Sequence, residues 1–223
     1  LLSAVEDREV NRIPTATFIL EDGSLADQTF PLSESGKLDF GMEIELQLGY
    51  QGTNETIFKG IITGQRIKLR GDKSLLVVSC KDKAFRMTVN RRTRYFEDVS
   101  DADAAETIIN EHGLEADVAA STDVVPELTL HLATDWDFLV SRAEANGQVV
   151  IVNNGKVSVL EPELAPAAAL TLEYGANVMR FDAEVDARHQ HATVESSAWS
   201  AADDEVVTED NGAGLPAAGD YST

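Results

Sequence analysis

The chain has 223 residues, of which 43% are hydrophobic, and a formal net charge of −21 at pH 7. This length and composition can bury a sizeable core, which excludes a disordered protein. The negative charge argues against direct nucleic-acid binding, because neutralising phosphates requires a cationic surface. No apolar run approaches the roughly 18 residues that a membrane helix needs, so we expect no membrane insertion by this segment. Cys80 is the single cysteine and lies in an apolar stretch, which predicts a buried structural thiol in a reducing cytoplasm.

The charge is unevenly distributed along the sequence. Between Lys59 and Arg94 there are eleven basic and two acidic residues, a net charge of +9, so the other residues carry −30. Such asymmetry favours an oriented assembly in which basic faces meet acidic faces of a neighbour. Solvated lysines on the outside of a sheet explain the same pattern equally well.

Short strand patterns dominate the first part of the chain. Residues 1–12 are polar and unpatterned and are expected to form an arm. Met42, Ile44, Leu46 and Leu48 alternate with polar residues, which is typical of a strand with one buried face. Further strands are expected at 15–20, 56–63, 65–69, 74–80 and 84–89, separated by turn residues that include Gly23, Gly64 and Gly71. Such spacing predicts a small antiparallel barrel or sandwich.

From Ser100 the hydrophobic period becomes helical. Ser100 and Asp103 fit a capping box, apolar residues recur from Ala102 to Ile109, and Gly113 is placed to end the helix. We expect an acidic loop at 114–126 and a strand at 128–132. This middle part therefore mixes α and β structure.

A second helix is predicted to begin after Thr134. Thr134 is expected to cap it with Asp137 completing a capping box, while Asp135 and Asp137 place negative charge at the positive end of the helix dipole. Trp136 and Phe138 are expected to anchor this helix against a barrel, and Gly147 to end it. Strands at 148–152 and 156–160 flank Asn153-Asn154-Gly155, which predicts a hairpin.

Beyond the hairpin, strands are expected at 178–187 and 192–199, and an irregular acidic tail from residue 201. Two strands alone leave both outer edges unpaired. We therefore interpret this part as the start of a sheet in a longer protein.

Four pieces of the sequence resemble one family when taken in order. They are Phe58-Lys59-Gly60-Ile61-Ile62-Thr63, the run Val77 to Arg86, the helix Asp101 to Leu114, and Thr134-Asp135-Trp136-Asp137-Phe138-Leu139 continuing to Gly147. The family is that of the hub proteins of contractile injection machines, namely phage late-control protein D and the amino-terminal part of type VI secretion VgrG proteins. The resemblance runs from about Met42 to Trp199.

The resemblance implies a mostly β fold with two related antiparallel β-barrels, the second incomplete in this chain, joined by a mixed α/β bridge. The implied domains are residues 13–92 (first barrel), 93–162 (α/β connecting segment) and 163–223 (start of the second barrel and acidic tail).

The implied function is structural. A homotrimer would act as a symmetry adaptor between a hexameric tail tube and a trimeric spike protein or spike domain, in contact with other baseplate proteins. It would be assembled in the bacterial cytoplasm into a phage tail or a similar particle. Residues 130–133 lack the aromatic-glutamine pattern of many type VI members, so phage tail, tailocin, extracellular injection particle and type VI secretion stay open.

Candidate chemistry is sparse, and we expect no enzymatic activity, metal or cofactor. His189 and His191 form an H-x-H pattern, for which solvated histidines are favoured over metal ligands. Asp135 and Asp137 could be read as an acid and base pair, although helix capping explains them better. The alternative function is therefore a cell-envelope-binding or glycan-hydrolysing module on a β-barrel. Arg91, Arg92 and Arg94 fit a small anion site and fit equally well a basic loop that docks on an acidic neighbour. The basic interface is predicted at five residues: Lys81, Lys83, Arg91, Arg92 and Arg94.

Overall fold

The computed structural model describes residues 1–23, 29–50, 52–70, 73–121, 124–163, 167–168, 170–178, 180–182, 184, 194–200 and 204–211. The chain divides into two compact units, Leu1–Pro162 and Glu163–Thr223. Each unit is described by itself below. Among the described residues, no helix combines the length and apolar character needed to cross a bilayer.

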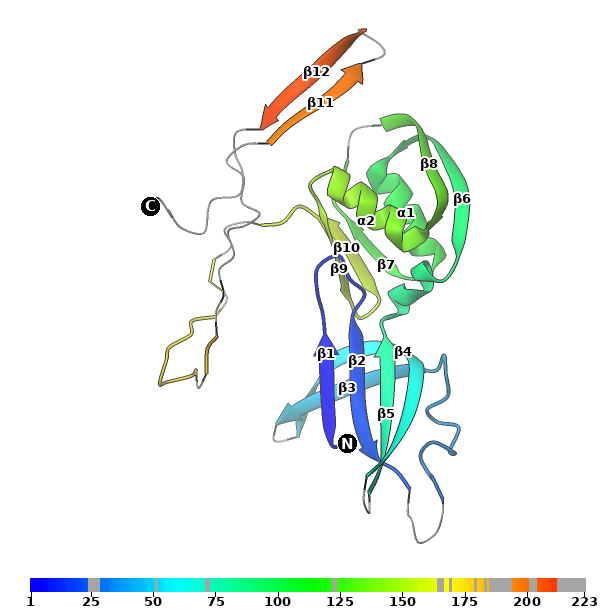
Figure 1. The fold of residues 1–223 in the computed structure, drawn as a ribbon, viewed down its shortest axis with the longest axis vertical. Helices are drawn as coiled ribbons and strands as arrows, with labels where there is room; N and C mark the ends of the chain where they lie inside the picture. Colours follow the sequence, from blue (N-terminus) through cyan, green and yellow to red (C-terminus); the bar gives the residue numbers. More distant parts are fainter. Residues whose placement is uncertain are drawn as a thin grey trace. The chain divides into compact units, whose positions relative to one another are not determined.

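Five strands of the described chain form one antiparallel sheet in the order β1-β2-β5-β4-β3. They are β1 (Ser3–Asp7), β2 (Thr15–Glu21), β3 (Glu43–Tyr50), β4 (Thr53–Arg70) and β5 (Lys73–Lys81). β4 spans 18 residues, and its pairing with β5 shifts register between Ile62 and Gly64. Because a bulge bends a strand and increases its twist, the sheet curls into a half-barrel (Figure 1). Arg8, just after β1, donates from Nη2 to the Ile57 carbonyl of β4 at 3.1 Å. This bond connects the edge strand β1 to β4, which is not its neighbour in the sheet.

The sheet differs from the expected strands at three places. The predicted arm at 1–12 contains β1, an edge strand whose residues alternate between exposed and half-buried. Residues 56–63 and 65–69 belong to one strand, because the pairing with β5 continues through the bulge at Gly64. Residues 84–89, expected as a strand, fall largely in a 3-10 helix, η1 (Lys83–Thr88). The Asp82 carboxylate caps η1 by accepting a bond from the Ala84 N–H at 2.9 Å.

One face of the sheet carries the first hydrophobic core. Its buried members are Ala16, Phe18, Phe58, Ile62, Leu76, Val78 and Cys80. They alternate along β2, β4 and β5, as burial of one sheet face requires. Cys80 is 1% exposed, which confirms the predicted buried thiol, and burial raises its pKa to about 11. Gly60 has no room for a side chain, since a Cβ there would lie 2.3 Å from the Lys81 carbonyl oxygen.

The rest of the first unit is an α/β region in which helices lie between two small sheets (Figure 1). Its elements are β6 (Arg91–Ser100), α1 (Asp101–Glu111), β7 (Glu115–Val118), β8 (Val124–Thr134), α2 (Asp135–Ala145), β9 (Val149–Asn153) and β10 (Lys156–Leu160). β6 pairs antiparallel with β8, while β10 pairs antiparallel with β9 and parallel with β7. α1 contacts β6 and β7, and α2 contacts β8 and β9.

Several predictions for this region are confirmed and two are wrong. The hairpin forms as expected, with positive φ at Asn154 (54°) and Gly155 (87°). The predicted basic loop at Arg91–Arg94 is instead the start of β6. The predicted acidic loop at 114–126 contains β7 and the start of β8. Both errors concern strands that pair with distant segments, which local periodicity does not reveal.

The helix starts follow the predicted capping pattern to different extents. At α1, Ser100 Oγ accepts from the Asp103 N–H at 3.1 Å, and the Asp103 carboxylate accepts from the Ser100 N–H at 3.3 Å. This capping box is complete. At α2, Thr134 Oγ1 accepts from the Asp137 N–H at 3.1 Å, but the structure shows no return bond from the exposed Asp137 side chain. The predicted box at α2 is therefore half formed.

Gly147 ends α2 as predicted. Its φ is 68°, its N–H bonds the Glu144 carbonyl at 3.1 Å, and the Gln148 N–H bonds the Ala143 carbonyl at 2.8 Å. These two bonds define a Schellman motif. Gly113, with φ of 69°, ends α1 in the same way.

The α/β region has its own hydrophobic core, built from α1, α2 and the strands on either side of them. Trp136 and Phe138 belong to this core, and the Phe138 ring stacks on Phe96 of β6 with centroids 6.0 Å apart. The expectation that they anchor α2 against the barrel sheet is therefore wrong. Residues at the first turn of α2 point to the β6–β8 ribbon, which is the sheet that precedes the helix in the chain.

Asp82 joins the half-barrel sheet to the α/β region. It is fully buried, and its carboxylate accepts one bond from the Ala84 N–H and one from the Gly155 N–H at the hairpin turn, each at 2.9 Å. Beside it, the Asn154 side-chain oxygen accepts from the Lys59 N–H at 2.8 Å. The turn between β9 and β10 is thus bonded to the first sheet at two points. Burial raises the pKa of Asp82, because desolvation disfavours its charged form.

The second unit contains the hairpin of β11 (Val194–Ser200) and β12 (Glu205–Asn211). β11 confirms the strand expected at 192–199, whereas β12 lies where an irregular tail was expected. Within 178–187, the described residues hold an isolated bridge at Val178 and no named strand. His189 and His191 lie outside the described residues. The second barrel stays a prediction.

Candidate assembly interface

Arg92 and Arg94, both predicted at an interface, are bonded within the chain. Arg92 donates from Nε to Asp135 Oδ1 at 2.7 Å and from Nη2 to Glu111 Oε2 at 3.0 Å. Arg94 donates from Nη1 to the same Glu111 oxygen at 2.7 Å, and its guanidinium lies 4.5 Å from the centroid of the Phe96 ring. These two side chains therefore hold β6 against the carboxyl end of α1.

Asp135 has more partners than the helix-dipole interpretation predicted. Its second oxygen lies 2.7 Å from His112 Nε2, and its side chain is 6% exposed. We call Arg92, Arg94, Glu111, His112 and Asp135 the Asp135 cluster. It joins the carboxyl end of α1 to the amino end of α2, where the helix dipole also favours a negative charge.

A second group, the Asp101 cluster, joins the opposite ends of the same helices. Arg142 donates from Nε and Nη2 to the two Asp101 oxygens at 2.7 and 2.8 Å, and Asn146 donates to Asp101 Oδ2 at 2.8 Å. Paired bonds of this kind fix orientation as well as distance. Together the two clusters hold α1 and α2 antiparallel.

Both clusters lower the pKa of a carboxyl group. Hydrogen bonds from Arg142 lower the pKa of Asp101, and the hydrogen bond from Arg94, with help from Arg92, lowers that of Glu111. Bonds to a charged form favour that form. The two carboxylates are accordingly ionised at neutral pH and stay so into mild acid.

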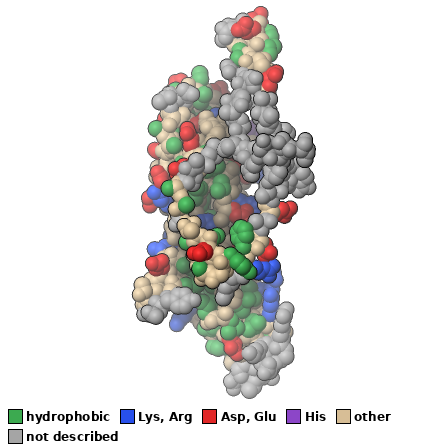
Figure 2. All heavy atoms as spheres, turned by 90° about the vertical axis from the view of Figure 1, so that its left-hand side faces the viewer, with side chains coloured by type: hydrophobic (Ala, Val, Ile, Leu, Met, Phe, Trp, Pro, Cys, Tyr) green, Lys and Arg blue, Asp and Glu red, His purple; other side chains and the backbone are tan. Residues whose placement is uncertain are grey.

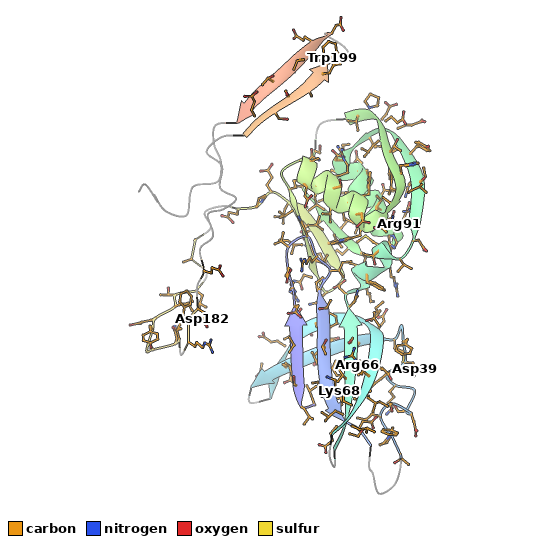
Figure 3. All side chains as sticks on the ribbon, viewed as in Figure 1. Asp39, Arg66, Lys68, Arg91, Asp182 and Trp199 are labelled. Carbon is orange, nitrogen blue, oxygen red and sulfur yellow. The ribbon has the colours of Figure 1, made fainter. Side chains whose placement is uncertain are left out.

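The other predicted interface residues differ in whether their charges are already paired within the chain. Lys83 pairs with Glu43 at 2.7 Å, and Lys81 Nζ lies 4.6 Å from the centroid of the Phe85 ring. Arg91 is exposed at the start of β6 (Figure 3) and has no ion pair among the described side chains. Acidic and basic side chains are mixed with hydrophobic ones on the face drawn in Figure 2. The charge asymmetry of the sequence is thus partly cancelled by pairing in the fold.

Two further groups of charges are candidates for an interface. Sequence reasoning included Arg66 and Lys68 only within the basic region 59–94, and it missed Glu97 and Glu127. Arg66 and Lys68 project from β4 without an ion pair among the described residues. Glu97 and Glu127 lie opposite each other on the exposed face of the β6–β8 ribbon. The alternation around Arg66 was a usable signal, but the glutamate pair could not be found without the pairing of β6 with β8.

A polar cavity of about 390 Å³ lies beside the turn between β9 and β10. It is lined by Glu43, Ile44, Glu45, Lys59, Gly60, Lys83 and Asn154. Lys83 pairs with Glu43 at 2.7 Å and Lys59 with Glu45 at 3.6 Å, so the charges in its wall are balanced.

The candidate acid and base pair of the alternative function is not arranged for catalysis. Asp135 is buried and bonded to Arg92 and His112, whereas Asp137 is exposed in the same first turn of α2. Within the part of the chain that the structure describes, no three His, Cys, Asp or Glu side chains gather as metal ligands.

Comparison with known proteins places this fold among phage tail and type VI secretion components. The chain is 29% identical over 163 residues to the probable baseplate hub protein of Escherichia phage 186, covering 72% of this chain and 41% of that protein. Its fold matches a tail protein from Neisseria meningitidis MC58 with a TM-score of 0.66 at 15% identity, covering 93% of this chain and 62% of the other. It also matches an Escherichia coli type VI secretion component with similarity to bacteriophage T4 tail proteins, with a TM-score of 0.54 at 12% identity, covering 90% and 55%.

The relationship to the phage 186 protein confirms the resemblance to baseplate hub proteins that the sequence predicted, and the solved structures share the fold. The chain belongs to the family of the Alg8 N-terminal domain, whose profile matches residues 2–223. It spans about two fifths of the length of the phage 186 protein and about three fifths of the Neisseria tail protein.

Proposed function

We propose that this chain is a structural part of a trimeric baseplate hub, an adaptor between a hexameric tail tube and a trimeric spike protein or domain. The observation that carries the proposal is the relationship to a phage baseplate hub protein over 72% of the chain. The mostly β fold, with an open half-barrel, supports it. Three copies that each supply two similar barrels could present six similar surfaces to a tube and threefold symmetry to a spike.

The role is one of assembly without catalysis. Asp135, the residue best placed to suggest acid or base chemistry, is bonded to Arg92 and His112 in a cluster that positions α2. The three-part division at residues 13–92, 93–162 and 163–223 belongs to this proposal, with the last part forming the start of a second barrel. Assembly would occur in the bacterial cytoplasm, into a phage tail or related particle.

The proposal is tested in the particle itself. Deleting the gene for the full-length protein should abolish complete particles, as seen by electron microscopy, and a plasmid copy should restore them. The protein should be found in purified particles at three copies per particle. Wild-type protein that hydrolyses purified peptidoglycan, with activity lost in Asp135→Asn, would instead support the envelope-active alternative.

A further inference from the structure

The outward face of β4 and β5 carries cations beside an apolar row. Arg66 and Lys68 are two residues apart on one face of β4, where Figure 3 labels both. Across the ladder, Arg66 lies opposite Val77 and Lys68 opposite Leu75, and Ile19 of β2 lies opposite Val77. These three apolar side chains are only half-buried. We call Ile19, Arg66, Lys68, Leu75 and Val77 the basic face.

The outward face of the β6–β8 ribbon has the complementary character. Glu97 lies opposite Glu127, and the neighbouring outward pair is Tyr95 and Thr129. Tyr95 is 62% exposed, and neither glutamate has a cationic partner among the described side chains. Like charges directly opposite each other destabilise a ribbon. We call Tyr95, Glu97, Glu127 and Thr129 the acidic face.

The two faces match in charge number and in spacing. Cations two residues apart on a strand stand about 7 Å from each other. Carboxylates on directly opposed residues start from Cβ atoms about 5 Å apart. Long side chains absorb that difference, so each cation can meet one carboxylate while the Tyr95 ring covers the apolar row.

We propose that the basic face of one copy binds the acidic face of the next copy. The inference rests on the proposed function and names the surfaces through which copies of that hub meet. A contact between two different faces is heterologous, so repeating it closes a ring when the rotation between copies allows. The contact also relieves the repulsion between the carboxylates of Glu97 and Glu127, and this relief favours association.

Charge-reversal variants test the pairing. Arg66→Glu with Lys68→Glu makes both faces acidic, and Glu97→Lys with Glu127→Lys makes both basic. Each double variant should weaken self-association at least about tenfold in sedimentation velocity, because like charges then meet across the contact. A quadruple variant that carries all four reversals should recover association to near the wild-type level. Lysines at positions 97 and 127 also repel each other across the ribbon. The repulsion within the chain is therefore similar in the variants and in the wild type.

The control variant combines Arg12→Glu with Lys37→Glu, which changes the net charge as much as the first double variant does. Arg12 and Lys37 are exposed and lie outside both faces. This variant should associate as the wild type does. Circular dichroism and thermal melting of every variant establish that each one folds.

The outcomes separate this inference from the proposed function. A wild-type chain that is monomeric throughout, double variants that associate normally, or a quadruple variant that does not recover would each overturn the paired faces. The hub function would still stand if the protein were found in particles at three copies. Recovery by the quadruple variant, in a protein that never enters particles, would support the paired faces and remove the hub.

Discussion

The half-barrel sheet and the α/β region differ in the partners that bond their buried and half-buried carboxylates. In and beside the sheet, Asp22 and Asp82 accept hydrogen bonds from backbone N–H groups of loops and turns. In the α/β region, Asp101 and Asp135 instead bond the side chains of Arg142, Arg92 and His112. The first arrangement fixes chain segments that have no regular partner. The second fixes the angle between helices, and it makes this region the one whose stability depends on charge.

The largest expected effects come from emptying either core. Phe58→Ala in the sheet and Phe138→Ala in the α/β region should each lower the free energy of unfolding by about 3–5 kcal/mol, because a cavity replaces a buried ring. Urea denaturation followed by tryptophan fluorescence and by circular dichroism measures both. If the two regions unfold as one cooperative unit, the two signals shift together in each variant. A shift of only one signal would mean that the regions unfold independently.

Asp82 tests the connection between the regions. Asp82→Ala should cost about 2–4 kcal/mol, because it leaves two backbone N–H groups buried without acceptors. Asp82→Asn should cost less, since its amide oxygen can still accept one bond. Hydrogen exchange at Gly155 should accelerate in the alanine variant, while exchange in the middle of α2 follows the global stability. An unchanged Gly155 would contradict the connection.

Arg142→Met should cost about 1–3 kcal/mol, because it leaves the Asp101 carboxylate with Asn146 as its remaining side-chain partner. The matched variant is Asp101→Asn, and the double variant completes a thermodynamic cycle. Coupling of about 1 kcal/mol or more would establish the bidentate pair as stabilising. Coupling near zero would show that α1 and α2 are held by their apolar contacts alone.

Asp82 and the ion-paired carboxylates Asp101 and Glu111 predict opposite responses to acid. Asp101 and Glu111 have pKa values lowered in the fold, so their stabilisation is complete above the ordinary values of 3.8 and 4.5 and is lost as pH falls through the lower folded values. Asp82 has a raised pKa, so its protonation on acidification relieves a desolvation cost. Between pH 6 and pH 3, the urea midpoint should fall less in Arg142→Met than in the wild type. In Asp82→Asn it should fall more than in the wild type.

The smallest effects concern the helix caps. Ser100→Ala and Thr134→Ala should each cost about 1 kcal/mol. Asp103→Ala should cost more than Asp137→Ala, because only Asp103 completes its capping box. Equal losses for the two aspartates in thermal melts would argue for a return bond from Asp137 in solution.

Local signals in the sequence predicted the elements whose causes are local. Ser100 and Thr134 predicted the starts of the two helices, Gly147 predicted the end of the second, and Asn154-Gly155 predicted the hairpin turn. Each of these residues acts through bonds within a few residues. The strand with alternating Ile44 and Leu46 was predictable for the same reason.

The remaining elements depend on contacts between distant residues. β1 pairs with β2 and β7 with β10 across loops or whole elements, and both are too polar to show a pattern. Asn11 illustrates the difficulty, since its side-chain oxygen accepts the Val150 N–H at 2.8 Å across more than a hundred residues. The Asp135 cluster was missed because Arg92 appeared to lie in a loop, although the family resemblance had already drawn attention to Asp135.

The burial of Cys80 has a practical consequence for chemical labelling. With a pKa of about 11, roughly one in a few thousand of its thiols is ionised at pH 7.5, and the sulfur is closed off by the sheet core. A cysteine introduced on the surface would therefore be the only thiol to react quickly with a maleimide. Fluorophores, spin labels or crosslinkers can then be placed at one chosen position on either face, with the native cysteine left where it packs.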